Sequence, residues 1–288
     1  MLAFARHPPL PAALLAGLLA TLLAAGGAIA VPPAAAARPA DATLCGFQTS
    51  LVGGDAYTVQ NNEWGSTAPE CIRNDGGADF TVTSSSIANP TDSYPGGYPS
   101  LYKGCHWGAC TFGSGLPIRV SRIKVGTVTT SWSTTQPGGG SDYDVAYDIW
   151  FNRTPATSGQ PDGTELMIWL NRNGPVQPSG SQVATDVSLG GRRYNVWYGG
   201  QIPDQVAYTL TAGTASVSNL DLRPLVADAI ARGYLSDSWY LIDVEAGFEI
   251  WNGGAGLATN SFSVHVTGGG GPWPSPIPVR HRGPAPGR

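Results

Sequence analysis

Charged side chains are scarce in this sequence. Asp, Glu, Lys and Arg together make up 12% of its 288 residues, about half of what a soluble domain usually carries. Lysine occurs only as Lys103 and Lys124, whereas all 20 acidic residues lie between Asp41 and Glu249. This acidic stretch lacks the clustered basic groups that hold a phosphate backbone. The composition therefore excludes nucleic acid as a partner.

Long apolar runs are also missing, with one exception at the N-terminus. Arg6 and His7 precede an apolar run over 10–23, and the small residues that follow end in an Ala-Ile-Ala site at 28–30. A positive start, an apolar middle and an A-x-A site predict a secretory signal peptide over 1–30. The alternative is an uncleaved membrane anchor. We expect a secreted, extracellular protein with no membrane contact after signal cleavage.

The sequence divides into four parts. After the signal, 31–40 is rich in Ala and Pro and is expected to be a short pro-segment. At the other end, 268–288 is rich in Gly and Pro, as in a flexible tail. The stretch between them, 41–267, shows no internal repeat and is expected to be one catalytic domain and a monomer. The 39 glycines and 24 prolines of the chain favour many turns over long helices.

Cysteine is limited to four positions, and an even number in an exported chain implies disulfides with three possible pairings. Cys105 and Cys110 enclose a short glycine-containing loop, which favours a local bridge and leaves Cys45 to pair with Cys71. The alternative is a metal site that uses His106. The domain holds one other histidine and no second close cysteine pair, so we expect neither a metal nor a cofactor.

Alternating hydrophobicity predicts strands. Over 142–151 every second residue is Tyr, Val, Ile or Phe, which places Asp148 and Trp150 together on the opposite face. Over 164–171 the leucines and Ile168 share one face, and Glu165, Met167 and Trp169 share the other. Shorter segments with strand character are 118–125, 127–133, 194–198, 207–210, 240–251 and 261–267.

One helix is predicted over 221–233, with Asp221 as its cap and Gly233 at its end. Many strands and a single short helix predict an all-β fold. We expect a two-sheet antiparallel β-sandwich of the jelly-roll type.

Glutamate occurs at only five positions, and two of them stand among aromatic residues. Glu165 shares a strand face with Met167 and Trp169, and Glu249 lies in the string Gly-Phe-Glu-Ile-Trp. A carboxyl among aromatic side chains is partly desolvated, which raises its pKa. Two such carboxyls across a groove can hydrolyse an acetal, since one donates a proton and the other attacks or activates water. Asp148 could hydrogen-bond one of the pair.

Simpler interpretations compete with this one. Each carboxylate could be an exposed or salt-bridged residue, and the tryptophans could belong to the core or to a non-catalytic sugar-binding sandwich. A binding module, however, does not need two carboxylates in its groove. Other hydrolase motifs are missing, because the chain has no G-x-S-x-G, no H-E-x-x-H and no Walker loop.

Several strings, taken in order, resemble glycoside hydrolase family 12, and in particular its actinobacterial endo-β-1,4-glucanases. The resemblance covers about 41–267. The strings are Gln60-Asn61-Asn62-Glu63-Trp64-Gly65, Cys105-His106-Trp107, Tyr147-Asp148-Ile149-Trp150, Glu165-Leu166-Met167-Ile168-Trp169, Gly247-Phe248-Glu249-Ile250-Trp251 and Asn260-Ser261-Phe262-Ser263.

The resemblance implies a jelly roll with a concave substrate groove and hydrolysis of internal β-1,4 bonds of cellulose or related β-glucans with retention. It implies that Glu165 is the nucleophile, Glu249 the general acid/base and Asp148 the hydrogen-bond partner of the nucleophile. It also agrees with the bridges Cys45–Cys71 and Cys105–Cys110. The implied substrate-binding residues are Asn62, Trp64, His106, Met167, Trp169 and Trp251. Retention predicts about 5–5.5 Å between the two catalytic carboxyls, against about 6.5–9.5 Å for inversion.

This chain departs from the family pattern at three places. Ile250 replaces the proline that usually follows the acid/base. Glu245 stands where a neutral residue is usual, and we expect it to lie farther along the strand with little effect. The Gly/Ser-rich loop 134–141 could change the groove rim. The preferred polysaccharide, whether cellulose, xyloglucan or mixed-linkage β-glucan, therefore stays open.

Overall fold

A computed structural model describes residues 41–199 and 204–268. The predicted signal peptide, the pro-segment and the tail beyond residue 268 lie outside the described residues. Within these residues, no helix has the length and apolar character needed to cross a membrane.

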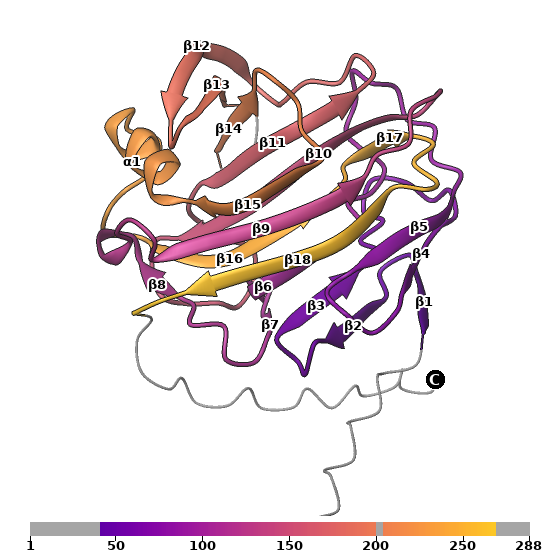
Figure 1. The fold of residues 1–288 in the computed structure, drawn as a ribbon, viewed down its shortest axis with the longest axis horizontal. Coiled ribbons are helices and arrows are strands. Elements are labelled where there is room, and N and C mark those ends of the chain that lie inside the picture. The colour runs from indigo at the N-terminus through magenta and orange to yellow at the C-terminus, as the bar shows by residue number, and fades with distance from the viewer. Residues whose placement is uncertain (1–40, 200–203, 269–288) are drawn as a thin grey trace, which may run out of the picture. The chain divides into compact units, whose positions relative to one another are not determined.

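The described residues form two β-sheets (Figure 1). In spatial order, the six-stranded sheet consists of β1 (Ala42–Cys45), β4 (Glu70–Asn74), β5 (Phe80–Ser85), β18 (Ala258–Val266), β9 (Val128–Thr135) and β15 (Ser216–Asp221). The twelve-stranded sheet consists of β12 (Ser181–Leu189), β13 (Arg192–Tyr198), β14 (Gln205–Leu210), β11 (Glu165–Asn173), β10 (Asp142–Asn152), β16 (Tyr240–Gly247), β6 (Ser100–His106), β3 (Tyr57–Gln60) and β2 (Thr49–Val52), with β7 (Ala109–Cys110), β8 (Ile118–Arg119) and β17 (Ile250–Asn252) paired beside them.

The main hydrophobic core lies between the two sheets. Trp132 of β9, which is 1% exposed, makes an edge contact with Tyr147 of β10, with 5.2 Å between the ring centroids. It also packs against Phe248 at 5.7 Å. Aromatic residues of both sheets therefore interdigitate, and the predicted two-sheet β-sandwich is confirmed.

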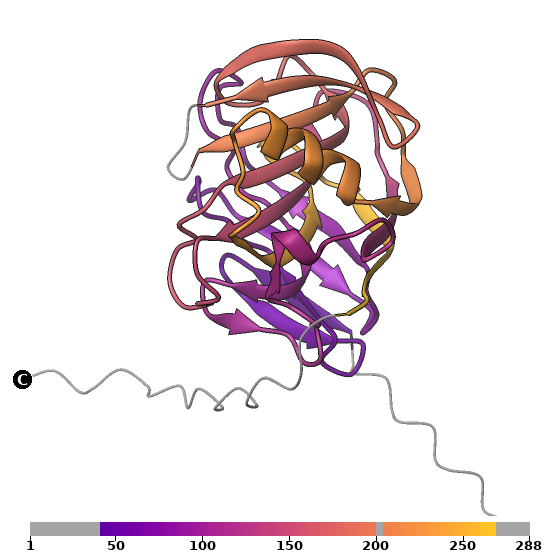
Figure 2. The same ribbon diagram turned by 90° about the vertical axis from the view of Figure 1, so that its left-hand side faces the viewer.

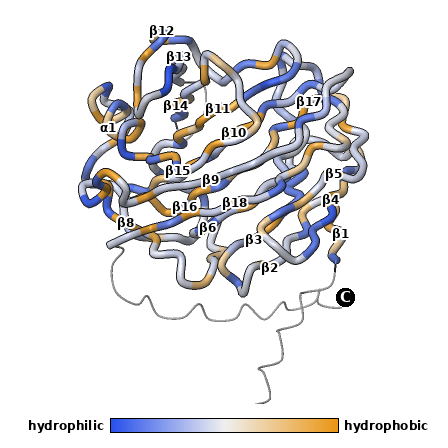
Figure 3. Tube along the Cα trace, viewed as in Figure 1, coloured by the Kyte–Doolittle hydropathy of each residue, from blue (hydrophilic) through white to orange (hydrophobic). Residues whose placement is uncertain are grey.

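The alternation predicted for β10 and β11 is also confirmed, and Figure 3 shows hydrophobic residues recurring at intervals along both strands. Tyr147 and Ile168 belong to the main core. Their neighbours Ala146, Met167 and Trp169 belong to a second, smaller cluster with Ala207 and Trp251. Successive side chains of a strand point to opposite faces, so this second cluster marks the face of the large sheet that points away from the core.

One strand pair departs from the expected antiparallel pattern. β11 pairs with β14 in parallel, and Glu165 lies opposite Gln205. β12 and β13 form an antiparallel pair at the sheet edge, and β14 returns between β13 and β11 in the direction of β11. The parallel pairing brings the first residues of two strands side by side.

Two predicted strands are interrupted. The strand expected over 118–125 ends after Arg119 and continues as a 3₁₀ turn over Val120–Arg122, where Ile123 N–H donates to the Val120 carbonyl at 2.9 Å. The strand expected over 240–251 is divided into β16 and β17, with Glu249 in the break between them. β10 keeps one register across this break, since Ala146 lies opposite Gly247 and Tyr143 lies opposite Ile250.

The predicted helix is α1 (Arg223–Ala231), which lies at one end of the sheets (Figure 2). Asp221 Oδ1 accepts a hydrogen bond from the Arg223 N–H at 3.0 Å, although the N-cap position itself is Leu222. Gly233 follows the helix with a φ of 82°, a conformation that glycine adopts without strain.

Both disulfides are present in the structure. Cys45–Cys71 joins β1 to β4, and Cys105–Cys110 closes the turn between β6 and β7. The first bridge links neighbouring strands of the small sheet, and the second holds the segment that carries His106.

Candidate active site

Glu165 is the first residue of β11 and is buried, with 7% of its surface exposed. The parallel pairing places Gln205 beside it, and Gln205 Nε2 donates a hydrogen bond to Glu165 Oε2 at 2.9 Å. Burial raises the pKa of Glu165 to about 7; the hydrogen bond from Gln205 lowers it, and the charge of Glu245 raises it. A carboxyl in this state changes charge near neutral pH.

Glu249 is half-buried in the break between β16 and β17. Its backbone is held by Asp144 of β10, because Glu249 N–H donates to Asp144 Oδ1 at 3.1 Å and Asp144 N–H donates to the Glu249 carbonyl at 3.0 Å. Burial raises the pKa of Glu249 well above its ordinary value, and the charges of Asp144 and Glu165 raise it further. This environment favours the protonated form of Glu249.

Glu249 lines a cavity that lies next to Glu165. Glu249, Trp169 and Trp251 line a space of about 50 Å³, together with Gln205, the hydrogen-bond partner of Glu165. The charge of Glu165 also acts on the pKa of Glu249. The structure therefore brings together two glutamates that are far apart in the sequence, on the face of the large sheet that points away from the core.

Asp148 lies next to this pair on β10. It is 6% exposed, lies opposite Met167 of β11 and Glu245 of β16, and hydrogen-bonds through its side chain with Glu165. Burial raises the pKa of Asp148 well above its ordinary value, and the charge of Glu165 adds to the effect. Asp148 and Glu165 thus form a coupled pair of buried carboxyls.

Sequence analysis does not identify three residues that complete this arrangement. Tyr98 is 3% exposed, its hydroxyl donates to the Ala146 carbonyl at 3.0 Å, and it lies close to Asp148. Nothing in the surrounding turn marks Tyr98. Gln205 and Asp144 carry a local signal: each lies two residues before a residue of the second cluster, Ala207 or Ala146, on the same strand.

The expectation that Glu245 lies aside and has little effect is wrong. Glu245 is fully buried, directly opposite Asp148, and its Oε1 accepts hydrogen bonds from Gln60 Nε2 at 2.6 Å and Ser100 Oγ at 2.5 Å. Its charge raises the pKa values of Asp148 and Glu165. The expectation rested on distance along the strand, whereas the pairing of β16 with β10 places Glu245 opposite Asp148.

His106 lies at the end of β6, on the other side of Glu245. His106 Nδ1 is 3.2 Å from Glu245 Oε2 and 3.7 Å from Asp243 Oδ2. Burial lowers the pKa of His106, but the two carboxylates outweigh it and raise that pKa to about 10. His106 is therefore a buried imidazolium that balances two acids. Its ring stacks on Tyr102 at 5.3 Å and contacts Trp107 at 4.1 Å.

The same three residues are the described group whose ligand atoms, within 4.8 Å of one another, could hold a metal ion. All three are enclosed: Asp243 and Glu245 are fully buried and the His106 side chain is 17% exposed. The protonated His106 already supplies a positive charge to the two carboxylates. The contacts here describe an ion-pair network.

The predicted substrate-binding residues differ in exposure. Trp64 is 45% exposed and stands edge-on to Tyr94 at 6.3 Å, whereas Trp169 and Trp251 are 2% and 4% exposed. Trp64 is thus largely open to solvent, whereas Trp169 and Trp251 belong to the second cluster and line the cavity. Asn62 turns the chain with a φ of 48°, and its carbonyl accepts the Tyr98 N–H at 3.0 Å.

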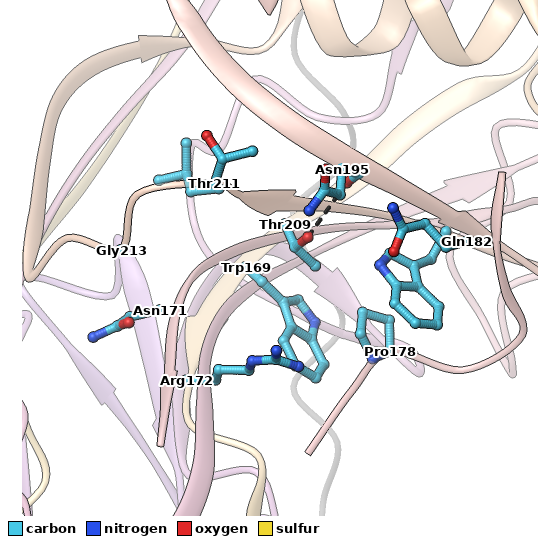
Figure 4. A pocket seen from close by; sticks show the side chains of 11 residues that line it. Trp169, Asn171, Arg172, Pro178, Gln182, Asn195, Thr209, Thr211 and Gly213 are labelled. Atoms are coloured by element: carbon cyan, nitrogen blue, oxygen red, sulfur yellow. Dashed lines mark hydrogen bonds between the residues drawn. The ribbon is translucent and has the colours of Figure 1, made fainter. Parts of the chain in front are cut away.

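A larger cavity of about 370 Å³ continues from Trp169 and Pro178 over β14, β13 and β12 (Figure 4). The Arg172 side chain lies beside the Trp169 indole, and Asn195, Thr209 and Gln182 supply polar groups. In the strand order of the large sheet, β12, β13 and β14 lie on one side of the strands that carry the two glutamates, and β3 lies on the other. The cavity is on the first side, and Trp64, which follows β3, is on the second. The lining residues thus form a row that crosses the strands.

A pair of carboxyls in an aromatic cleft is the arrangement that glycosidases use. The chain belongs to glycosyl hydrolase family 12, whose family model matches residues 55–267. It is thus an enzyme of the glycoside hydrolase class.

The names of solved structures and curated relatives support this family membership. The structure of "Endoglucanase cel12A from Rhodothermus marinus" is 45% identical and has a TM-score of 0.73; the match covers 78% of this chain and 98% of that one. "Probable cellulase Cel12b" of Mycobacterium tuberculosis is 35% identical over 54% of this chain and 99% of its own length. "Xyloglucan-specific endo-beta-1,4-glucanase A" of Emericella nidulans is 31% identical over 78% of this chain and 92% of its own.

Proposed function

We propose that the protein is an endo-β-1,4-glucanase that hydrolyses internal bonds of cellulose or a related β-glucan with retention. The observation that carries the proposal is the placement of Glu165 close to Glu249, which lines an aromatic cavity. The names of the relatives support the substrate class.

The environments of the two carboxyls favour one division of roles. Hydrogen bonds from Gln205 and Asp148 lower the pKa of Glu165 and so favour its ionised form, whereas the Asp144 hydrogen bond raises the pKa of Glu249. An ionised Glu165 suits a nucleophile, and a protonated Glu249 suits a general acid.

In the first step, Glu249 gives its proton to the glycosidic oxygen while a Glu165 oxygen attacks the anomeric carbon. The bond from that carbon to the leaving sugar breaks, and a covalent glycosyl-enzyme forms. In the second step, the ionised Glu249 takes a proton from water, whose oxygen attacks the same carbon and releases Glu165. Asp148 holds Glu165 in position through both steps.

The other residues of the cleft bind the substrate. Trp64 stacks on a sugar through its exposed ring, Asn62 and His106 contribute to the groove edge, and Met167, Trp169 and Trp251 form its floor. The large cavity beside Trp169 extends the binding row and bears on the choice between a plain and a branched glucan. Because one relative is named xyloglucan-specific, xyloglucan is the second candidate substrate.

We also propose that the catalytic domain over 41–267 is exported by the signal over 1–30, loses the 31–40 segment and acts as a monomer. N-terminal sequencing of the secreted protein tests this export.

Glu165→Gln and Glu249→Gln test the mechanism. Each should remove nearly all hydrolysis of carboxymethylcellulose, xyloglucan and barley β-glucan, and the wild-type product pattern on this panel identifies the preferred substrate. Azide should rescue Glu249→Ala and form a β-glycosyl azide, because azide replaces the water of the second step. An α-glycosyl azide would contradict retention, and full activity of either Gln variant would contradict the site.

A further inference from the structure

Asp144 stands out among the buried acidic residues because the catalytic steps above do not use it, although it touches Glu249 at three points. The Asp144 carboxylate accepts the Glu249 N–H at 3.1 Å, the Asp144 N–H donates to the Glu249 carbonyl at 3.0 Å, and the two side chains hydrogen-bond. Asp144 is fully buried, and its second carboxylate oxygen, Oδ2, accepts no hydrogen bond from an N–H or hydroxyl group of the described residues.

These contacts compensate for a gap in the sheet. β16 pairs with β10 as far as Gly247, and the pairing resumes with β17 at Ile250, so Glu249 has no regular ladder partner. The paired backbone contacts with Asp144 replace that ladder at the position where the side chain must be aimed. An isolated glutamate in such a break would be free to shift with its backbone.

We infer that Asp144 is a positioning residue for the general acid: its carboxylate fixes the Glu249 backbone and accepts the hydrogen bond of the protonated Glu249 carboxyl. This inference rests on the proposed role of Glu249. Asp144 itself touches neither the substrate nor the reacting atoms, so it acts only through Glu249.

The carboxyls around Asp144 and Glu249 all favour the protonated form of Glu249. Glu249 faces Asp144 on β10 and Glu165 on β11, and Asp144 also faces Asp148 on its own strand. The Tyr98 hydroxyl, from the segment before β6, is near enough to be affected by Asp144, Asp148 and Glu249, and also by Glu245. The charged groups that act most strongly on Glu249 are thus acidic, and they favour its protonated form. Asp144 makes the largest contribution after burial.

Asp144→Asn tests the inference because the amide keeps the shape and the acceptor for the Glu249 N–H but loses the charge. The basic limb of kcat/KM against pH, which reports the general acid of the free enzyme, should move to lower pH by about 1 unit or more. KM should change little, and kcat above neutral pH should fall. Asp142→Asn is the matched control, since it removes one charge from the same strand, two residues away; its basic limb should stay at the wild-type position.

A folded Asp144→Asn enzyme with the wild-type basic limb would overturn the inference. If that variant does not fold, ¹³C NMR titration of the carboxyl groups in the wild-type enzyme decides. Coupled titration of Asp144 and Glu249 supports the inference, and a single independent step for Glu249 overturns it. The proposed function is tested separately: it fails if Glu249→Gln is fully active, whereas azide rescue of Glu249→Ala together with an unmoved Asp144→Asn profile rejects only the role of Asp144.

Discussion

Asp148 and Glu245 lie directly opposite each other on β10 and β16, both buried, and Asp148 hydrogen-bonds the candidate nucleophile Glu165. Glu245 is a buried carboxylate that the family pattern does not require. In space, only Asp148 lies between it and the nucleophile Glu165. The charge of Glu245 raises the pKa values of Asp148 and Glu165. The pH range of the enzyme should therefore depend on Glu245.

Glu245→Gln should extend activity to lower pH. The charge of Glu245 raises the pKa of Glu165, so its removal lowers that pKa and moves the acidic limb of kcat/KM to lower pH by about 1 unit. The pH profile on a soluble β-glucan measures this shift. Asp237→Asn, an exposed charge in the turn before β16, should leave the limb in place, and an unmoved limb in Glu245→Gln would contradict the prediction.

Gln205→Leu should have the opposite effect. The Gln205 side chain donates to Glu165 at 2.9 Å and thereby lowers the pKa of that carboxyl. Without the donor, the acidic limb should move to higher pH by about 1 unit, and activity below neutral pH should fall. Gln48→Leu, a change of an exposed side chain in the turn between β1 and β2, is the control and should keep the wild-type limb. An acidic limb that moves down in Gln205→Leu would show that Gln205 does not stabilise the ionised nucleophile.

His106 should make stability depend on pH. Burial opposes its charge, but Glu245 and Asp243 raise its pKa to about 10, above the ordinary 6.5. A group whose pKa is raised by folding stabilises the folded state fully below about pH 6.5 and loses this contribution as pH rises through about 10. His106→Asn should therefore lower the free energy of unfolding near pH 6, by at most about 3–5 kcal/mol.

Urea unfolding at pH 6 and pH 9.5 measures this effect. The difference in unfolding free energy between wild type and His106→Asn should shrink at the higher pH. A difference that is the same at both values would mean that His106 is neutral in the folded protein.

Trp64→Ala should weaken substrate binding with little effect on stability. The ring is 45% exposed and makes only an edge contact with Tyr94, so the fold loses little. Loss of one stacking partner is worth about 0.5–1.5 kcal/mol, so KM should rise roughly 2- to 12-fold with kcat nearly unchanged. Phe112→Ala, an exposed aromatic residue after β7, should keep the wild-type KM; an equal effect of both changes would argue against a subsite at Trp64.

Local alternation carries a large part of the site. Because side chains alternate along a strand, the sequence places Asp148 and Trp150 on one face of β10, and Glu165, Met167 and Trp169 on one face of β11. The structure agrees for both strands. Alternation alone cannot distinguish a catalytic carboxyl from a solvated one. The resemblance of the motif strings to the family is what predicts the catalytic roles.

Alternation along a strand does not predict which distant strands pair with each other. The strand expected over 240–251 runs through Glu249 without a break, whereas the structure divides it there into β16 and β17. Alternation also gives no partner for Glu245, and the pairing of β16 with β10 places it opposite Asp148. Register between strands separated by about a hundred residues depends on the whole sheet and has no local signal.

The sequence by itself determined the all-β class, the two glutamates and the faces on which their neighbours lie, because period-two patterning and short motifs are properties of consecutive residues. Only the tertiary structure decided that Gln205 holds Glu165, that Asp144 holds Glu249 and that Glu245 joins His106 to Asp148. These contacts link strands from distant parts of the chain, and they form only when the large sheet folds in one register.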